Sequence, residues 1–262
     1  MATINNNLLT YQKGSEKKQS IVFIHGFPFD HKMWDLQIDR FKENYNCFTY
    51  DIRGLGKSPA GDGQFTIENF VDDLFGLIEE FKLIHPVLCG LSMGGYIALR
   101  AIERDEEKFK ALILCDTKSE ADNNAGKINR ANAIKEINNS GAEKFAENFV
   151  QKCFAERFIN NNKKEYEEVV SRAKASVPAG LKGCLLAMAA RTDTTSYLPQ
   201  IKVPVLVLCG EQDKLTTPAV MKAMADKING SEFHVVPEAG HVTPVENPEF
   251  FNAKLEKFLS TL

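Results

Sequence analysis

The segment Gly90-Leu91-Ser92-Met93-Gly94 combines a serine with glycines two residues to either side of it. An apolar run typical of a buried strand precedes the segment, and a helical pattern follows it. A serine on such a tight strand-to-helix turn has strained backbone dihedrals, and side chains in place of the glycines would collide with neighbouring backbone. This context favours Ser92 as a nucleophile. The alternative is a glycine-rich loop in which the serine only caps the following helix.

A serine hydroxyl is a poor nucleophile at neutral pH, so Ser92 needs a base, and the base needs a carboxylate to orient it. Of the five histidines, His241 is expected in a loop between the last strand candidate and the final helix. Asp213 follows the preceding strand candidate, which brings both side chains to the same sheet edge as Ser92. The order Ser92, Asp213, His241 is a known chain order for such triads. Asp116, at the end of another strand candidate, is the rival acid, and its alternative role is to cap the following helix.

The six cysteines are expected to be small buried hydrophobic residues with inert thiols. Disulfide frameworks belong to short secreted chains, and this chain is long. No two cysteines have CxxC spacing and none has a histidine at ligand spacing, so we expect no zinc or other metal site. A Ser/His/Asp site also requires no organic cofactor, and the sequence predicts none. The cysteines are Cys47, Cys89, Cys115, Cys153, Cys184 and Cys209.

Short apolar and β-branched runs alternate with amphipathic stretches, a pattern that predicts βαβ units around a parallel sheet. Several of the runs are apolar at almost every position, as expected for strands that helices cover on both faces. The strand candidates are Ser20–His25, Asn46–Asp51, Pro86–Gly90, Ala111–Asp116, Val203–Gly210 and Glu232–Val236.

Helices are expected between and after these strands. Apolar residues after Thr66 recur at helical spacing, and Thr66 is a candidate N-cap, although Asn69 is a poor match for the Glu or Gln of a full capping box. Met93–Arg104 follows the serine turn. Pro248–Leu262 closes the chain, with its proline in the first helical turn.

The middle of the chain breaks this alternation, because residues 118–196 contain no strand candidate. This stretch holds too much helix for a crossover between neighbouring strands, so we expect an inserted helical subdomain. The predicted division is a core of residues 1–116 and 197–262 and a helical cap of residues 117–196. The helix-like blocks are Ala121–Asn139, Ala142–Phe154, Lys163–Ala175 and Leu181–Arg191.

Length and composition are typical of one large α/β domain, with 262 residues of which 44% are hydrophobic and 26% charged. The net charge of -3 leaves no basic surplus to neutralise phosphates, so nucleic-acid binding is disfavoured. No apolar run approaches the ~18 residues of a membrane span, and the first residues do not resemble a signal peptide. We therefore expect a cytoplasmic protein that binds neither nucleic acid nor membrane, and the sequence leaves its oligomeric state open.

Five segments, in the same order, resemble the landmarks of the α/β-hydrolase superfamily, and the resemblance extends over nearly the whole chain. They are His25–Pro28, Asp51–Ser58, Gly90–Gly94, Gly210–Asp213 and Gly240–His241. The resemblance is strongest to small esterases, 3-oxoadipate enol-lactonases and cofactor-free haloperoxidase-like perhydrolases. It implies an α/β fold with a mostly parallel eight-stranded sheet, flanked by helices, and a helical cap inserted between strands six and seven.

Further site residues follow from the same layout. The backbone N–H of Met93, directly after the nucleophile, is one donor of an oxyanion hole, and the resemblance makes the N–H of Phe27 the second. Phe27 and Trp34 are the candidates for an apolar substrate pocket. Within the Asp51–Ser58 loop, an ion pair of Arg53 with a carboxylate such as Asp51 is expected to fix the loop rather than to take part in chemistry.

These observations predict a serine hydrolase that cleaves a small-molecule carboxylic ester or lactone through an acyl-enzyme. Ser92 is the expected nucleophile, His241 the base and Asp213 the acid. Alternatives on the same fold are an enol-lactonase, a C–C bond hydrolase, a perhydrolase and a small-molecule receptor with feeble turnover. Dehalogenase and epoxide hydrolase chemistry is excluded, because both need an aspartate where Ser92 stands.

Overall fold

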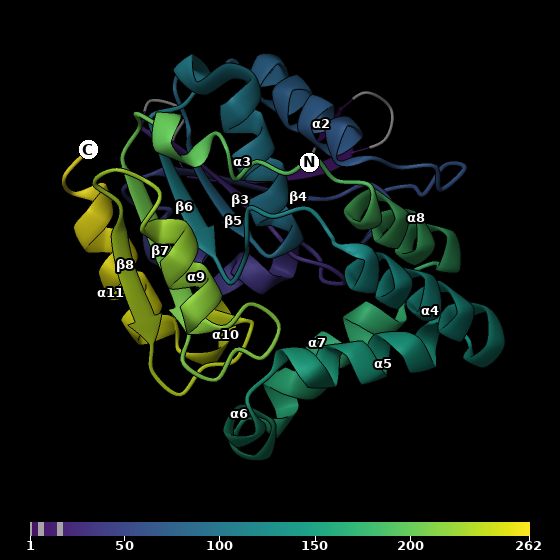
Figure 1. The fold of residues 1–262 in the computed structure, drawn as a ribbon. Helices are drawn as coiled ribbons and strands as arrows, with labels where there is room; N and C mark the ends of the chain where they lie inside the picture. Colours follow the sequence, from purple (N-terminus) through teal and green to yellow (C-terminus); the bar gives the residue numbers. More distant parts are fainter. Residues whose placement is uncertain (1, 5–7, 15–17) are drawn as a thin grey trace.

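The computed structural model describes the chain except for residues 1, 5–7 and 15–17, and the predicted lack of a signal peptide falls partly on those residues. The described strands form one eight-stranded sheet of order β1-β2-β4-β3-β5-β6-β7-β8 (Figure 1). The strands from β4 to β8 in this order are parallel, and β1 and β2 are antiparallel at one edge. The predicted α/β class is thereby confirmed. The strands are β1 (Ala2–Ile4), β2 (Leu8–Lys13), β3 (Ser20–Ile24), β4 (Asn46–Asp51), β5 (Val87–Leu91), β6 (Ala111–Cys115), β7 (Val205–Gly210) and β8 (Glu232–Val236).

Helices cover both faces of the sheet. Successive residues of a strand point to opposite sides, so a strand that is apolar throughout packs against helices on both faces. Val22 and Ile24 of β3 belong to a hydrophobic cluster with residues of α2, α3 and α9. Ile21 and Phe23 of the same strand belong to a second cluster with residues of α1 and α11. All four side chains are fully buried. These helices are α1 (Asp35–Phe41), α2 (Ile67–Glu80), α3 (Met93–Asp105), α9 (Pro218–Ala225) and α11 (Pro248–Leu259).

The start of α2 corrects one expectation about its cap. The hydroxyl of Thr66 accepts from the backbone N–H of Asn69, and the Asn69 side chain accepts from the backbone N–H of Thr66, so both halves of a capping box are present. The Asn69 amide oxygen serves as the acceptor that Glu or Gln usually supplies, because only one oxygen at the right reach is needed.

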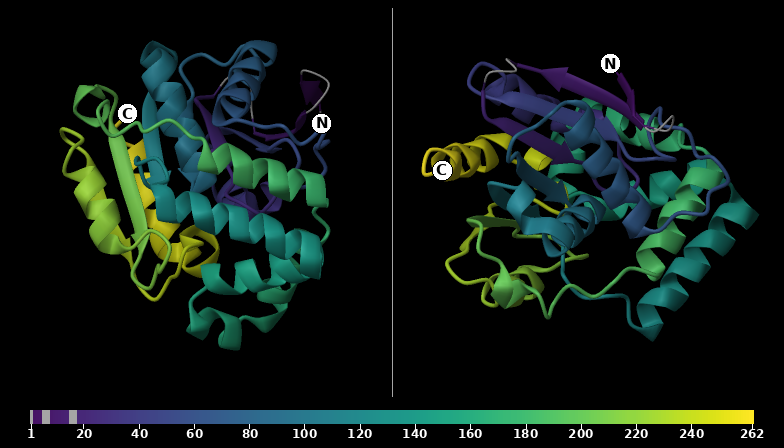
Figure 2. Two further views of the ribbon diagram at one scale, coloured as in Figure 1. Left: turned by 45° about the vertical axis from the view of Figure 1, so that its right-hand side comes forward. Right: turned by 90° about the horizontal axis from the view of Figure 1, so that it is seen from above.

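A helical insertion (α4–α8) lies between β6 and β7 and gathers on one side of the molecule (Figures 1 and 2). Within it, α4 packs against α8 and α5, and α5 packs against α7. The short α6 was not predicted, and α8 begins at Pro178 rather than Leu181, since proline suits the first helical turn. The insertion consists of α4 (Asn124–Ser140), α5 (Ala142–Cys153), α6 (Glu156–Asn161), α7 (Lys163–Lys174) and α8 (Pro178–Ala189).

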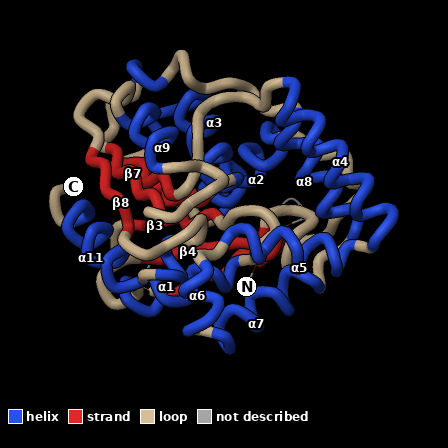
Figure 3. Tube along the Cα trace, turned by 60° about the horizontal axis from the view of Figure 1, so that its bottom comes forward, coloured by secondary structure: helices blue, strands red, loops and turns tan. Residues whose placement is uncertain are grey.

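Loops run between the sheet and the insertion at the edge where the parallel strands end (Figure 3). Ligands of open α/β sheets bind outside the carboxyl ends of the strands, so this edge is where a site is expected. Within the described residues, none of the helices has both the length and the apolar character that crossing a membrane requires. The remaining short elements are η1 (His31–Trp34), η2 (Glu106–Lys108), η3 (Leu198–Gln200) and α10 (Thr243–Glu246).

Candidate active site

Ser92 stands on the turn between β5 and α3, in a backbone conformation that few residues adopt. Its φ is 54° and its ψ is -112°, and such conformations cost about 1–3 kcal/mol and gather at functional sites. The turn is fixed from both sides. The N–H of Ser92 donates to the carbonyl of Cys115 at 2.9 Å, and the hydroxyl of Thr117 donates to the Ser92 carbonyl at 2.7 Å.

The flanking glycines are required by close backbone contacts. A Cβ placed on Gly90 would lie 2.4 Å from the carbonyl oxygen of Gly94, and a Cβ on Gly94 would lie 2.2 Å from that of Ile24. Both distances are far shorter than any van der Waals contact. The sequence indicated such collisions from the motif, and the structure shows the backbone atoms responsible.

The structure brings together Ser92, His241 and Asp213. The hydroxyl oxygen of Ser92 lies 2.9 Å from Nε2 of His241. Nδ1 of the same ring lies 2.8 Å from Oδ2 of Asp213. Because an ionised carboxylate only accepts, Nδ1 carries the proton of the neutral ring and Nε2 accepts from the serine hydroxyl. This arrangement lets the histidine take the proton of the serine.

Asp213 is held in place by the residues that follow it. Its Oδ1 accepts from the backbone N–H groups of Leu215 and Thr216, at 2.7 and 3.0 Å. Its Oδ2 accepts from the Thr216 hydroxyl at 2.6 Å. Burial alone would raise the pKa of Asp213, but the His241 ring and these hydrogen bonds outweigh it and hold the pKa below its ordinary value. Asp213 is therefore ionised at neutral pH.

The pKa of His241 results from opposing effects. Burial lowers it, whereas the charge and hydrogen bond of Asp213, and the charges of Asp116 and Glu246, raise it by more. The outcome is a pKa above the ordinary value of histidine. A buried imidazole with such neighbours is a stronger base than a free one, which suits a group that must accept a proton from serine.

Asp116 forms no hydrogen bond with Nδ1 of His241, and it does not cap the helix that follows it, α4, as its alternative role required. Its Oδ1 accepts from the N–H of Gly210 at 2.8 Å, and its Oδ2 from the hydroxyl of Thr243 at 2.6 Å. The helix that follows, α4, is capped by Asn123 instead. Burial, and then repulsion by Asp213, raises the pKa of Asp116 to about 7.

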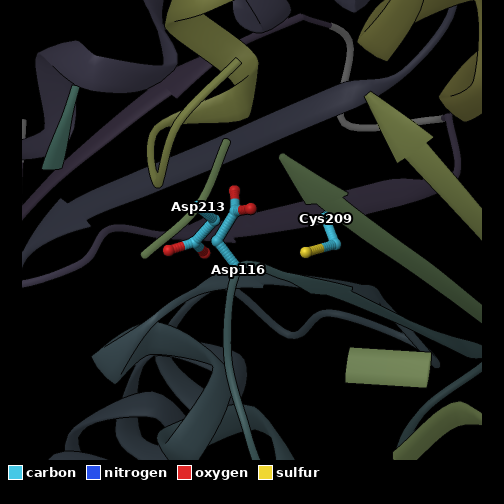
Figure 4. A group of neighbouring side chains, drawn as sticks. All are labelled: Asp116, Cys209 and Asp213. Atoms are coloured by element: carbon cyan, nitrogen blue, oxygen red, sulfur yellow. The ribbon is translucent and has the colours of Figure 1, made fainter. Parts of the chain in front are cut away.

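Asp116, Asp213 and Cys209 form the one group in the described part of the chain with potential metal-ligand atoms close together, all within 4.8 Å of one another. Figure 4 shows the two carboxylates side by side and the thiol pointing toward them. The oxygens of both carboxylates are already engaged by backbone, hydroxyl and imidazole hydrogen bonds. Burial raises the pKa of the Cys209 thiol, which opposes formation of a metal-binding thiolate. These donors fit a hydrogen-bond network better than an ion.

Phe27 and Met93, the two candidates for an oxyanion hole, both adjoin Ser92. Met93 is the first residue of α3, so its N–H has no partner within the helix. Phe27 follows Gly26, where an added Cβ would lie 3.2 Å from Cβ of Ser92. Among the described residues, neither the N–H of Phe27 nor that of Met93 donates to a backbone carbonyl. Both donors are thus available to a substrate oxygen.

A cavity of about 500 Å³ opens over Ser92 and His241, within the usual range of small-molecule sites. One wall is apolar and consists of Phe27 and residues of the helical insertion, among them Phe145 and Phe149. The ring of Phe27 packs edge-on against Phe149 at 5.2 Å. Another part of the lining, which comes largely from α4 and the loop before it, is polar. Its side chains include Lys118, Asp122, Asn129, Arg130 and Glu136.

Trp34 does not line this cavity, which corrects the pocket expected from the sequence. Its side chain is fully buried and packs against Phe23 and Phe251, with ring centroids 5.1 and 6.2 Å away. The η1 turn directs Trp34 to the sheet face that α1 and α11 cover, whereas Phe27 belongs to the cluster on the other face.

The loop around Asp51 is held by an ion pair of Arg53 with a carboxylate, as expected, and Asp51 makes contacts of its own. Arg53 forms a two-pronged ion pair with Asp73 of α2, at 2.7 and 2.5 Å, and not with Asp51. Asp51 accepts instead from the N–H and ring of His31. His25 accepts from the N–H of Ile52 at 2.9 Å, so it braces this region and does not reach the cavity.

A family model for the alpha/beta hydrolase fold matches residues 19–248. The chain therefore belongs to the α/β hydrolase fold family, which confirms the family predicted from its motifs. The structure of a thermophilic esterase from Thermogutta terrifontis, with malate bound, is 32% identical and covers 97% of this chain and 93% of its own, with a TM-score of 0.92. The enol-lactonase from Burkholderia xenovorans LB400 is 25% identical, covers 99% of both chains and also has a TM-score of 0.92. The curated relative 3-oxoadipate enol-lactonase 2 of Acinetobacter baylyi is 27% identical over 243 residues, which are 93% of this chain and 89% of that protein.

Proposed function

We propose that this protein is a serine hydrolase that cleaves a small-molecule carboxylic ester through an acyl-enzyme. The observation that carries the proposal is the unbroken hydrogen-bond chain from Ser92 through His241 to Asp213, with distances of 2.9 and 2.8 Å. The strained turn under the serine supports it, because a merely structural serine has no need of that conformation.

The reaction follows from the positions of these groups. Ser92 Oγ attacks the ester carbonyl carbon while Nε2 of His241 takes the serine proton, and the carbonyl oxygen becomes an oxyanion. The N–H groups of Phe27 and Met93 bind that oxyanion; one such donor typically lowers the barrier by about 2.7–4 kcal/mol. His241 then gives its proton to the departing alcohol oxygen. Water, deprotonated by His241, releases the acid, and the proton returns to Ser92. Asp213 stabilises the imidazolium in both halves.

A lactone is the second candidate substrate class, and the enol-lactonases among the relatives favour it. The same groups open a lactone, except that the leaving hydroxyl remains covalently linked to the acyl chain and departs with it as one hydroxy acid after water attacks the acyl-enzyme. Residues 117–196 are proposed to act as a cap over the reacting groups, since part of the cavity wall comes from α4, α5 and α8. The apolar wall suits an acyl chain, and the polar wall suits a substituted alcohol or acid.

A fluorophosphonate that carries a reporter group tests the nucleophile. It should modify the wild-type protein at Ser92 and leave Ser92→Ala unmodified, while Ser171→Ala, which changes an exposed serine of α7, should react as the wild type does. In a panel of p-nitrophenyl esters and lactones, Ser92→Ala should lower kcat by several orders of magnitude, on the order of 10³-fold or more. Full esterase or lactonase activity in that variant, with an unchanged circular dichroism spectrum, would refute the assignment.

A further inference from the structure

The helical insertion touches the loop that carries His241 through backbone atoms. The N–H of His241 donates to the carbonyl of Cys153, the last residue of α5, at 2.7 Å. A Cβ placed on Gly240 would lie 2.7 Å from the nitrogen of Ala155 and 2.8 Å from the Cys153 oxygen. The α5–α6 connection (Cys153–Ala155) therefore lies directly on the backbone that carries the imidazole, with no side chain between them.

Glu246, the last residue of α10, fastens these two segments together. Its Oε2 accepts from the N–H of Ala155 in the insertion at 2.7 Å. Its Oε1 accepts from the N–H of Val242 at 3.0 Å, and the N–H of Gly240 also hydrogen-bonds to this carboxylate. Hydrogen bonds to an ionised group are stronger than those between neutral groups. A single side chain thus holds the backbone before and after His241 and the insertion at once.

This contact has no substitute on the side of the insertion. Ala155 stands at the N-cap position of α6, and no side chain of its own caps the helix. The carboxylate of Glu246 therefore accepts from the N–H of the N-cap residue, the bond that the third helical residue supplies in a capping box, although 91 residues separate it from Ala155. Loss of this acceptor leaves a partly buried N–H unpaired and frees the connection to move against His241.

We propose that Glu246 is a positioning residue for His241: it fixes the α5–α6 connection to the loop backbone, so that the insertion sets the alignment of the imidazole between Ser92 and Asp213. The inference rests on the proposed serine hydrolase function. It makes the insertion part of the machinery that orients the base, in addition to being a wall of the cavity. A displacement of the imidazole by about 1 Å is enough to slow such a reaction by about 100-fold.

The two roles of the insertion differ in the kinetic constant that they affect. If the insertion only shaped the cavity, loss of Glu246 would raise KM and leave kcat and the reactivity of Ser92 unchanged. If Glu246 positions His241, its loss lowers kcat, and Ser92 reacts more slowly even with a small fluorophosphonate that does not fill the cavity. KM then changes little.

The experiment compares Glu246→Ala and Glu246→Gln with the wild type. Glu246→Gln keeps the shape and leaves one oxygen to accept, and it is the variant to read if Glu246→Ala does not fold. Glu249→Gln, an exposed glutamate three residues further on, is the matched control. We expect kcat and the rate of fluorophosphonate labelling to fall together by about 10–100-fold in Glu246→Ala, less in Glu246→Gln and not at all in Glu249→Gln. KM for a p-nitrophenyl ester should stay within about twofold.

The pH profile supplies a readout that a purely structural role would not affect. The charged groups that act on His241 are Asp213, Asp116 and Glu246, and all three raise its pKa against the effect of burial. Removing the charge in Glu246→Gln should therefore move the acid limb of kcat/KM to lower pH.

The outcomes separate this proposal from the one on which it rests. A wild-type protein that neither turns over esters or lactones nor reacts with the fluorophosphonate refutes the hydrolase function itself. An active wild type whose Glu246→Ala and Glu246→Gln variants keep its kcat, labelling rate and pH profile refutes the positioning role. A rise in KM alone refutes it as well, because it assigns Glu246 to the shape of the cavity.

Discussion

Replacement of Asp116 by asparagine isolates the effect of a buried carboxylate next to the proposed triad. Burial, and then the charge of Asp213, raises the pKa of Asp116 from 3.8 to about 7. Between these values the folded protein keeps a proton that the unfolded chain has released, so the free energy of unfolding falls as pH rises through this window. The window spans roughly 3 pH units, and at about 1.36 kcal/mol for each it corresponds to a loss on the order of 4 kcal/mol.

Asp116→Asn removes this titration but also removes an acceptor. The carboxylate accepts from Gly210 with one oxygen and from Thr243 with the other, whereas asparagine has a single acceptor oxygen. The unpaired donor costs about 1–3 kcal/mol at every pH. Relative to the wild type, the variant should therefore be less stable by about 1–3 kcal/mol at pH 4 and should gain up to about 4 kcal/mol on going to pH 8.

Urea unfolding at several pH values between 4 and 8, followed by circular dichroism, measures this difference. Asp62→Asn, which changes an exposed aspartate, provides the control and should show a constant difference from the wild type. A stability difference between Asp116→Asn and wild type that stays constant across the pH range would refute the reasoning.

Two further substitutions examine the surroundings of the site. Thr216→Val keeps the volume but removes the hydroxyl that donates to Asp213 at 2.6 Å. Because hydrogen bonds to charged groups contribute about 1.5–3 kcal/mol, kcat/KM should fall about tenfold or more, and Thr216→Ser should restore it. Wild-type kinetics in Thr216→Val would count against the role of the hydroxyl. Lys118 borders the cavity, and its ammonium lies 3.9 Å from the nearest Asp122 oxygen, too far for a hydrogen bond. Lys118→Met should weaken binding of p-nitrophenyl esters of diacids by up to about 1 kcal/mol, which raises their KM several-fold, and should leave KM for neutral esters unchanged. Equal effects on both classes of ester would show that the charge is not used.

The parallel part of the sheet was predictable because strands covered on both faces are continuous apolar runs, as in Val205–Gly210. The edge strands β1 and β2 were missed, since β1 has only three residues and β2 mixes apolar with polar residues. In the insertion, the long helices were found from their length and spacing, whereas the six-residue α6 was too short to show a helical period.

Within the site, the sequence indicated Ser92, Asp213 and His241 because each lies in a motif that local geometry explains. The contacts of Glu246 were hidden, because no local pattern relates a glutamate at the end of one short helix to the N–H of Ala155 in the insertion. The face toward which Trp34 points was equally hidden. An aromatic residue near a landmark shows that a site is apolar, but the rotation of the η1 turn decides which side of the sheet it joins.

Three carboxylates surround His241, and their hydrogen bonds explain why the fold tolerates them together. Each of them accepts from backbone N–H groups around the site: Asp213 from Leu215, Asp116 from Gly210 at the end of β7, and Glu246 from Ala155 in the insertion. Buried carboxylates placed for their charge alone would repel one another and incur a large desolvation cost, and these two effects raise the pKa of Asp116. Because each one also holds nearby backbone through these hydrogen bonds, the same groups that raise the pKa of His241 help to fix its position. Geometry and basicity of the imidazole are therefore coupled, and a substitution at any of the three should change both the rate and its pH dependence.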